Sequence, residues 1–447
     1  MSVRPGRVQG AAVRPAVTAT AVPPSETPAA GPAEAPATPR REPLGAQFRV
    51  HLAGVSLANL ADGIVAAGVP LIAVGLTRSP AEISLLSVAF WLPWLLLGIV
   101  AGLVVDRSDR RRVQLAGMAV RAVLLVALTV AAVRDALTMP LLIGAVLAYG
   151  VTQVFIDLAA TSMVPTVVVR SRLSAANGRV LASEQVFQAF VGAPVGGLLL
   201  VLGAGWVMGV PAALAVLFLL TIGLGLRGRS YREEREHAAP ALTEIGAGLS
   251  FLLRHPVLRP FMVSGSLINM VNTGYFAVFV LWVVGEGSAV GLSPQGYPLL
   301  LALLAVGAVA GSLSVERLTR RFREVPVLLT CWTLNALTLL VPALWPHPVP
   351  IGAAMLVLGA TNTVGNVLSM TIRQRLVAPA MLGRVGGAGR TLGFGLMPLG
   401  ALLGGLAAEA WGLQVVFVGT TAVALLALVY PATRVTQDLV DRHELPG

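Results

Sequence analysis

A single carboxylate lies midway along the first long apolar segment of the chain. Asp62 follows Asn59 by three residues, so a helix places both side chains on one face. If that helix crosses a membrane, an ionised carboxylate there costs roughly 2.5–3.5 kcal/mol, a cost that is usually tolerated for function. Asp62 is therefore a candidate for loading and releasing a proton, and Asn59 for hydrogen bonding to Asp62 or to a cargo. The alternative is a structural hydrogen bond from a protonated Asp62 to a neighbouring helix.

Arg121, inside the third apolar segment, needs a partner of opposite charge. At 1.5 Å per residue from the helix ends, Asp157 and Glu184 reach a similar depth. We therefore expect a buried cluster of Arg121 with these carboxylates. The predicted proton-coupling residues are Asp62, Arg121 and Glu184, whereas gating is favoured for Asp157 over a place in a proton relay.

The seventh apolar segment repeats the pattern of the first with amides. Asn269 and Asn272 lie 210 positions after Asn59 and Asp62, so the titratable group belongs to one half of the chain. We consider Asn59, Asn269 and Asn272 candidate substrate contacts. Amide hydrogen bonds between helices, worth about 0.6–2 kcal/mol, are an equal alternative for the two asparagines of the second half.

The composition of the chain indicates that these residues lie in membrane-spanning helices. Of the 447 residues, 56% are hydrophobic and 12% are charged, against about 25% charged in soluble domains, which excludes a soluble globular fold. Uniformly apolar segments also exclude the alternating strands of a membrane barrel. We predict an all-α polytopic membrane protein whose twelve transmembrane helices form two pseudo-symmetric six-helix bundles.

The basic residues assign the two sides of the membrane. All 32 are Arg, and alternate loops carry 21 of them whereas the loops between carry two, Arg78 and Arg134. By the positive-inside rule, both termini are cytoplasmic in a plasma or inner membrane. The expected parts are a disordered cytoplasmic tail, an N-terminal bundle, a cytoplasmic connector, a C-terminal bundle and a cytoplasmic C-terminal tail, at residues 1–47, 48–226, 227–259, 260–430 and 431–447.

Several functions are excluded by what the sequence lacks. One cysteine and five scattered histidines build neither a disulfide framework nor a metal site, so no metal or cofactor is expected. The absence of Lys excludes a Walker A motif and hence ATP as the fuel. No set of catalytic residues is visible at the helix ends, so we expect no enzyme. The net charge of +11 is explained by the loops and does not indicate nucleic-acid binding.

The loop after the second helix resembles a known signature. Its residues are Gly102, Asp106, Arg107, Arg110 and Arg111, and a similar series stands at 311–321 in the second half. This series resembles the cytoplasmic signature of the major facilitator superfamily. Asp109, where the general signature has Gly, is typical of the branch that includes macrolide efflux proteins and the enterobactin exporter. Segments 164–177 and 244–259 resemble the same branch, so the likeness covers about residues 45–435.

The resemblance implies the major facilitator fold, with substrate bound near the midplane between two halves that rock around it. It also implies that the signature residues latch the cytoplasmic ends together, and that Asp157 pairs with one of their arginines. The predicted gating residues are Gly102, Asp106, Arg107, Arg110, Arg111 and Asp157. Topology determined by positive charge is the plainer role of these arginines, and both roles are compatible.

The fifth helix resembles the antiporter signature of drug exporters. Gly192, Pro194, Gly196 and Gly197 match it, with Ala193 in place of a Gly. Small residues let helices pack closely and Pro bends a helix, so these are predicted helix-packing residues. The Arg that the family carries in helix four is missing, so proton coupling has to rest on Asp62 or on the cluster of Arg121.

These observations predict a secondary active transporter. The leading hypothesis is proton-coupled efflux of a lipophilic small molecule, such as an antibiotic, a macrolide-like compound or a siderophore, by alternating access. The expected partners are the substrate, protons and membrane lipids, and the expected state is a monomer. The alternatives are an importer or lysolipid-type transporter of the same fold, or a non-transporting membrane receptor.

Overall fold

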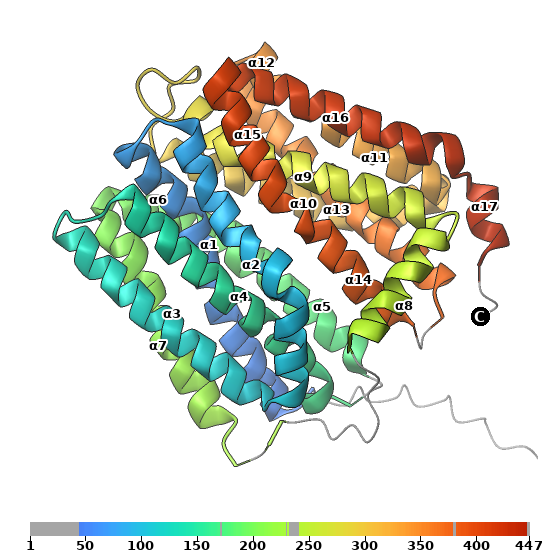
Figure 1. The fold of residues 1–447 in the computed structure, drawn as a ribbon, viewed down its shortest axis with the longest axis horizontal. Helices are drawn as coiled ribbons and strands as arrows, with labels where there is room; N and C mark the ends of the chain where they lie inside the picture. The colour runs from blue at the N-terminus through green and yellow to red at the C-terminus, as the bar shows by residue number, and fades with distance from the viewer. Residues whose placement is uncertain (1–43, 170–171, 229, 232–240, 379–380, 445–447) are drawn as a thin grey trace, which may run out of the picture. The chain divides into compact units, whose positions relative to one another are not determined.

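The computed structural model describes residues 44–169, 172–228, 230–231, 241–378 and 381–444. These residues form helices and no strand, and twelve helical spans among them are long and apolar enough to cross a membrane (Figure 1). The first half contains α1 (Ala46–Leu76), α2 (Pro80–Arg107), α3 (Arg110–Val133), α4 (Met139–Val167), α5 (Leu173–Ser183), the π-helix η2 (Glu184–Gly192), α6 (Ala193–Leu202) and α7 (Ala204–Gly225). The second contains α9 (Leu258–Val283), α10 (Gly296–Arg321), α11 (Glu324–Thr338), α12 (Val341–Leu344), α13 (Pro348–Leu376), α14 (Leu382–Gly395), α15 (Met397–Trp411) and α16 (Leu413–Arg434).

Matching residues turn and break the chain in both halves. Gly203 between α6 and α7 has φ 118°, and Gly412 between α15 and α16 has φ 87°, so both use backbone conformations that glycine adopts without strain. Pro194 is the second residue of α6, which continues from the π-helix η2, and Pro398 is the second residue of α15, after the break that follows α14. Proline cannot donate the helical hydrogen bond, which explains why the regular α-helix is interrupted at both places.

The largest apolar core shared by the two halves lies at one end. We call the end with Arg107 and Arg373 the Arg-rich end, and the opposite end, with Arg78, the Arg-poor end. At the Arg-poor end, one cluster of buried side chains joins Ile72 of the first half to Phe279 of the second. Toward the Arg-rich end each half has its own core. The common packing therefore holds the halves together at the Arg-poor end.

Polar contacts between the halves reinforce this closed end. Ser79 Oγ donates a hydrogen bond to Glu409 Oε2 at 2.9 Å, and the backbone N–H of Ala81 donates to the same oxygen at 3.3 Å. Glu409 of α15 thus caps the N-terminus of α2 across the interface. Arg78 Nη1 also donates to the carbonyl oxygen of Val284 at 3.0 Å.

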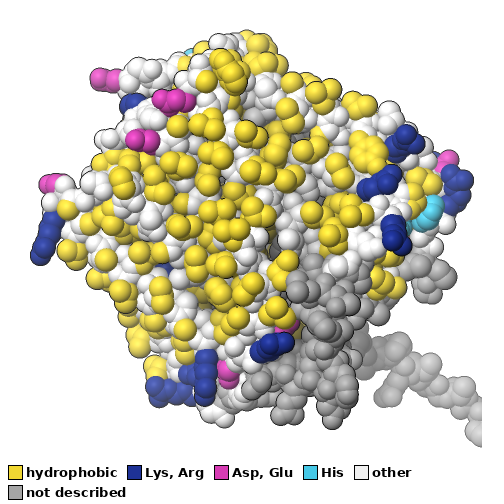
Figure 2. Space-filling view, in the orientation of Figure 1, with side chains coloured by type: hydrophobic (Ala, Val, Ile, Leu, Met, Phe, Trp, Pro, Cys, Tyr) yellow, Lys and Arg dark blue, Asp and Glu magenta, His cyan; other side chains and the backbone are white. Residues whose placement is uncertain are grey.

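The outer surface suits contact with lipid. Hydrophobic side chains cover most of the face in Figure 2, and charged side chains lie at its margins. Val123 on α3 and Leu426 on α16 are each 71% exposed. Exposure of large apolar side chains on this scale is unfavourable in water and is expected where acyl chains replace water.

The segments outside the spans contain more structure than the sequence indicates. Within the expected connector lies α8 (Ala241–Arg254), which packs against α14 (Figure 1). The last span continues to Arg434, past the expected boundary at 430. A short helix, α17 (Gln437–Arg442), then docks by an ion pair of 2.9 Å between Asp438 and Arg323. The disorder expected for residues 1–47 concerns a segment of which 1–43 lie outside the described residues.

Candidate transport site

An ion pair buried among the helices of the first half forms the centre of the candidate site. Asp62 lies on α1 and Arg121 on α3, and Arg121 Nη1 is 2.9 Å from Asp62 Oδ1. Arg121 is fully buried and Asp62 is 8% exposed. Removal of one member of such a pair leaves an uncompensated charge, which typically costs about 3–5 kcal/mol.

Helix α4 supplies the remaining contacts of this pair. Tyr149 donates its hydroxyl proton to Asp62 Oδ1, and its ring lies 4.0 Å from the guanidinium carbon of Arg121. Arg121 also donates to Thr152 Oγ1 at 3.2 Å and to Gln153 Oε1 at 2.5 Å. The guanidinium is therefore held by an acid, an amide, a hydroxyl and an aromatic face at once.

Gln153 connects the ion pair to a second carboxylate. Its Nε2 atom lies 3.0 Å from both carboxylate oxygens of Asp157 and 3.3 Å from Asp62 Oδ2. Asp157 lies one turn further along α4 and is half-buried. One amide thus accepts a hydrogen bond from Arg121 and donates to two acids, so a change of charge at either acid affects the hydrogen bonding of the other. We call Asp62, Arg121, Tyr149, Gln153 and Asp157 the charged network.

These contacts differ from the expected pairing of Arg121 with Asp157 and Glu184. The ion pair is formed with Asp62, and Asp157 is reached through Gln153. Glu184, at the start of η2, is exposed, which corrects the expected buried position. The expected pairing of Asp157 with an arginine of the loop signature is replaced by its hydrogen bonds with Gln153. Residue depth along a helix is readable from sequence, but the rotation that aims each side chain depends on packing.

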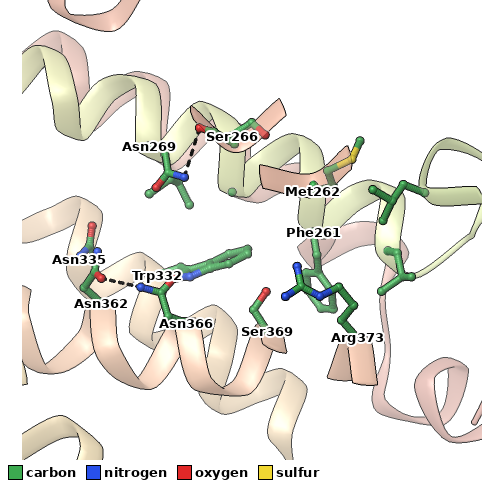
Figure 3. A pocket seen from close by; sticks show the side chains of 16 residues that line it. Phe261, Met262, Ser266, Asn269, Trp332, Asn335, Asn362, Asn366, Ser369 and Arg373 are labelled. Atoms are coloured by element: carbon green, nitrogen blue, oxygen red, sulfur yellow. Dashed lines mark hydrogen bonds between the residues drawn. The ribbon is translucent and has the colours of Figure 1, made fainter. Parts of the chain in front are cut away.

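The second half has a cavity where the first half has the charged network. It has a volume of about 180 Å³ and lies among α8, α9, α11, α13 and α14. Figure 3 shows Ser266 and Asn269 on one side and Asn362, Asn366 and Ser369 of α13 on the other. Asn366 Nδ2 donates to Asn362 Oδ1 at 2.8 Å. Asn362, Asn366, Ser369 and Arg373 are not among the predicted site residues, although their spacing of four, three and four residues places them on one helix face.

The three predicted substrate contacts lie in different surroundings. Asn269 lines the cavity, and its Nδ2 atom donates to the carbonyl oxygen of Gly393 at 3.4 Å. Asn59 Nδ2 and Asn272 Oδ1 are buried with no hydrogen-bond partner among the described residues. The structure therefore does not bring the three asparagines together, and Asn269 alone of the three faces the cavity described above.

The loop signature joins elements of the first half. Arg111 donates to the carbonyl oxygens of Ile222 and Gly223, at 3.3 and 2.7 Å, and buried Arg110 donates to that of Tyr231 at 3.3 Å. Asp109 caps α3 by accepting from the backbone N–H groups of Arg111 and Arg112. The other signature residues, Gly102, Asp106 and Arg107, lie in the last turns of α2, where Asp106 and Arg107 are exposed.

The predicted packing residues of the fifth span lie at two helix contacts. A Cβ atom on Gly192 would lie 2.9 Å from the carbonyl oxygen of Leu60, and one on Gly196 would lie 2.6 Å from that of Ile64. These glycines let η2 and α6 approach the backbone of α1. Gly197 instead faces Pro298 of α10, where α6 meets the second half. The three glycines thus allow contact within a half and between the halves.

A comparison with protein-family models identifies the family of the chain. The model described as Major Facilitator Superfamily matches residues 52–388. The chain belongs to the major facilitator superfamily. Its twelve spans and its membership make it a multi-pass transporter of the cell membrane that handles a small-molecule substrate, a class distinct from enzymes.

Relatives in sequence agree with this family, and solved structures show the same fold. The chain is 26% identical over 397 residues to the multidrug efflux pump Tap of Mycobacterium tuberculosis, covering 85% of this chain and 92% of the pump. It is 28% identical over 389 residues to the pump Tap of Mycolicibacterium fortuitum, covering 83% and 91%. The fold is similar to that of the nucleoside transporter NupG, with a TM-score of 0.68, 13% identity and coverage of 88% and 100%. A bacterial homologue of the lysosomal transporter Spinster, in an inward-facing and unoccupied conformation, gives a TM-score of 0.65 at 15% identity, with coverage of 90% and 98%.

Proposed function

We propose that this member of the major facilitator superfamily exports a lipophilic small molecule in exchange for protons. The similarity to the mycobacterial multidrug efflux pumps supports export. The charged network supports proton exchange, because titratable groups inside membrane helices are costly and usually mark a function. In this proposal the protein acts as a monomer among membrane lipids.

The distribution of arginine supports a cytoplasmic Arg-rich end, with both termini on that side. The halves share their core at the Arg-poor end, so the structure then represents a state that is closed toward the outside. Separation of Ser79 from Glu409, and of Arg78 from Val284, is the step that opens the outer side. The arginines of the loop signature, with Asp106, latch the cytoplasmic ends in the outward-open state.

The single observation that carries proton coupling is the charge of the network. One guanidinium, that of Arg121, is hydrogen-bonded within a set that contains two carboxylates, Asp62 and Asp157. One proton shared by the two acids makes the network neutral, and its loss leaves one negative charge. Because Asp62, Arg121 and Gln153 lie on three helices, protonation changes how strongly α1, α3 and α4 are held together. Glu184, exposed nearby on η2, is proposed as the group that exchanges protons with water.

The test is export from cells loaded with a panel of fluorescent dyes and antibiotics, with and without a protonophore. We expect the wild type to extrude at least one compound and to stop when the proton gradient is collapsed. Asp62→Asn and Asp157→Asn are each expected to lower the export rate at least about tenfold, which corresponds to about 1.4 kcal/mol. The matched control is Asp135→Asn, the same change at an exposed loop carboxylate.

Three results contradict the proposal. Export that is insensitive to the protonophore would show that export is not coupled to protons. Export by Asp62→Asn and Asp157→Asn at the wild-type rate at every pH would show that the charged network takes no part in transport. Accumulation of the compounds in place of extrusion identifies an importer.

A further inference from the structure

The cavity of the second half is lined by α8 and by helices of the second bundle, and it is partly open, since Asn362 and Asn366 are exposed. Its lining comes from α8, α9, α11, α13 and α14, and no described residue of the first half is part of it. Its volume of about 180 Å³ compares with the roughly 150 Å³ of an engineered protein cavity that holds one benzene molecule. The cavity therefore suits one ring of a larger ligand.

Polar groups are arranged along the length of this cavity. On α13 they run from Asn362 to Arg373, eleven residues apart, which is about 16 Å along the helix. Across the cavity, α9 contributes Ser266 and Asn269 (Figure 3). Amides and hydroxyls both donate and accept hydrogen bonds, so most of these groups match a partner that also does both.

One buried oxygen atom of the cavity indicates that the ligand carries a hydrogen-bond donor. Asn335 on α11 is 2% exposed and lines the cavity, and its Oδ1 atom has no hydrogen-bond partner among the described residues. A buried acceptor left in this state costs about 1–3 kcal/mol, so it favours a ligand that donates a hydrogen bond. A carboxylate or phosphate has only acceptors in its ionised form and does not satisfy this oxygen.

The charge of the lining disfavours a basic ligand group at this place. Among the described residues that line the cavity, Arg373 is the only ionisable one and none is an acid. A ligand cation would therefore stay uncompensated. The indole of Trp332 and the ring of Phe261, whose centroids lie 5.9 Å apart, add an apolar wall. What remains is a neutral ring that carries hydroxyl groups and has an apolar face.

We propose that this cavity binds a glycosyl group of an otherwise lipophilic cargo, with Asn335, Asn362, Asn366 and Asn269 as the residues that recognise its hydroxyls. This inference rests on the proposed function in one respect, that the ligand is the transported cargo. The lipophilic part of the cargo then lies outside the cavity, in the space toward the first half.

Calorimetric titration of the purified protein in lipid nanodiscs tests the proposal with two defined probes. The probes are octyl β-glucoside and tetraethylene glycol monooctyl ether, which share an octyl chain and differ in the sugar ring. We expect wild type to bind the glucoside about tenfold more tightly than the ether. Asn335→Leu and Asn362→Leu should each weaken glucoside binding about fivefold to tenfold and leave ether binding unchanged, since each removes one neutral hydrogen bond.

Gln114→Leu is the matched control, because it makes the same kind of change, loss of a buried amide, on α3 of the other half. Both probes partition into the lipid of its nanodiscs as they do with wild type. It should bind both probes as wild type does. If Asn335→Leu does not fold, Asn362→Leu, at an exposed position, decides alone.

Equal affinity of wild type for the two probes overturns the proposal, as does full glucoside binding by both cavity variants. Tighter binding of octyl phosphate than of the glucoside also overturns it and assigns an anion site at Arg373. The titration needs no ion gradient. A protein that binds the glucoside but exports nothing refutes the efflux proposal alone, and one that exports dyes but does not distinguish the probes refutes the glycosyl site alone.

Discussion

Corresponding helices of the two halves carry different chemistry. In the first half, α1, α3 and α4 bring an Arg and two acids into one hydrogen-bonded network. In the second half, α9, α11 and α13 carry amides around a cavity. Asn272 stands where the repeat pattern has Asp62, and Cys331 stands 210 positions after Arg121.

This difference indicates a division of labour between similar bundles. Ionisable groups that hydrogen-bond to one another change their net charge when a proton binds. Neutral amides around free space do not respond to a proton but offer hydrogen bonds to a ligand. We infer that the first half couples transport to energy and that the second half recognises the cargo. Four substitutions examine the contrast, from the largest expected effect to the smallest.

Arg121→Met removes the cation of the charged network. It leaves Asp62 buried without its partner, so we expect a loss of about 3–5 kcal/mol in unfolding free energy, measured by SDS titration of the purified protein. The double variant Arg121→Met with Asp62→Asn should recover most of this loss. A single variant as stable as wild type would show that the ion pair does not stabilise the first half.

Asn272→Asp places in the second half the acid that the first half carries. No Arg of α11 is available to it as Arg121 is to Asp62, so we expect a loss of about 2.5–3.5 kcal/mol, the insertion cost of an unpaired mid-membrane acid. The same titration measures it, with Asn272→Leu as the uncharged control. Unchanged stability would mean that the second half tolerates an acid as the first does, and the contrast would fail.

Gln153→Leu cuts the link between the two acids and keeps the ion pair. Asp157 loses the amide that donates to both of its oxygens, and a hydrogen bond to a charged group is worth about 1.5–3 kcal/mol. We expect a loss of about 2 kcal/mol and a flattened pH dependence of export. Gln114→Leu serves as the control for loss of a buried amide. Normal pH dependence in Gln153→Leu would show that the two acids act separately.

Arg375→Gln examines an ion pair of the second half that lies near the surface. Arg375 Nη1 is 2.6 Å from Glu324 Oε2, and both side chains are partly exposed, so we expect a loss of at most about 1 kcal/mol. A loss as large as that of Arg121→Met would contradict the assigned difference between buried and surface pairs.

Arg375 also makes the docking of the C-terminal segment depend on pH. Arg375 also donates to Glu444, and this hydrogen bond lowers the pKa of Glu444 below its usual value of about 4.3. The contact therefore stabilises the docked tail above about pH 4.3 and is lost as the pH falls through the lower folded pKa. Limited proteolysis after residue 434 should become faster in acid for wild type and should depend less on pH for Arg375→Gln.

The fold was predictable because its signals are repeated along the chain. Apolar length gives each span, and the series at Gly102 and at 311–321 gives the duplication. Asp62 and Arg121 were found because a charge inside an apolar segment stands out. Their pairing was not, because it depends on the rotation of three helices about their axes.

Neutral residues of the site were harder to find. Tyr149 and Gln153 have side chains that occur throughout proteins, and no spacing marks them as partners of Asp62. The stripe from Asn362 to Arg373 is readable as one helix face, but the cavity exists only through Trp332 and Asn335 of a different helix. Free space is a property of several packed helices together, and one segment of sequence does not encode it.

The apolar core that joins Ile72 to Phe279 also gives the conformational equilibrium a thermal signature. Opening that end exposes this core to water, and hydration of apolar surface raises the heat capacity of the opened state. Hydrophobic association weakens on cooling, so low temperature shifts the population toward the form in which these side chains are apart. Temperature thus acts on the resting orientation of the transporter without any ligand.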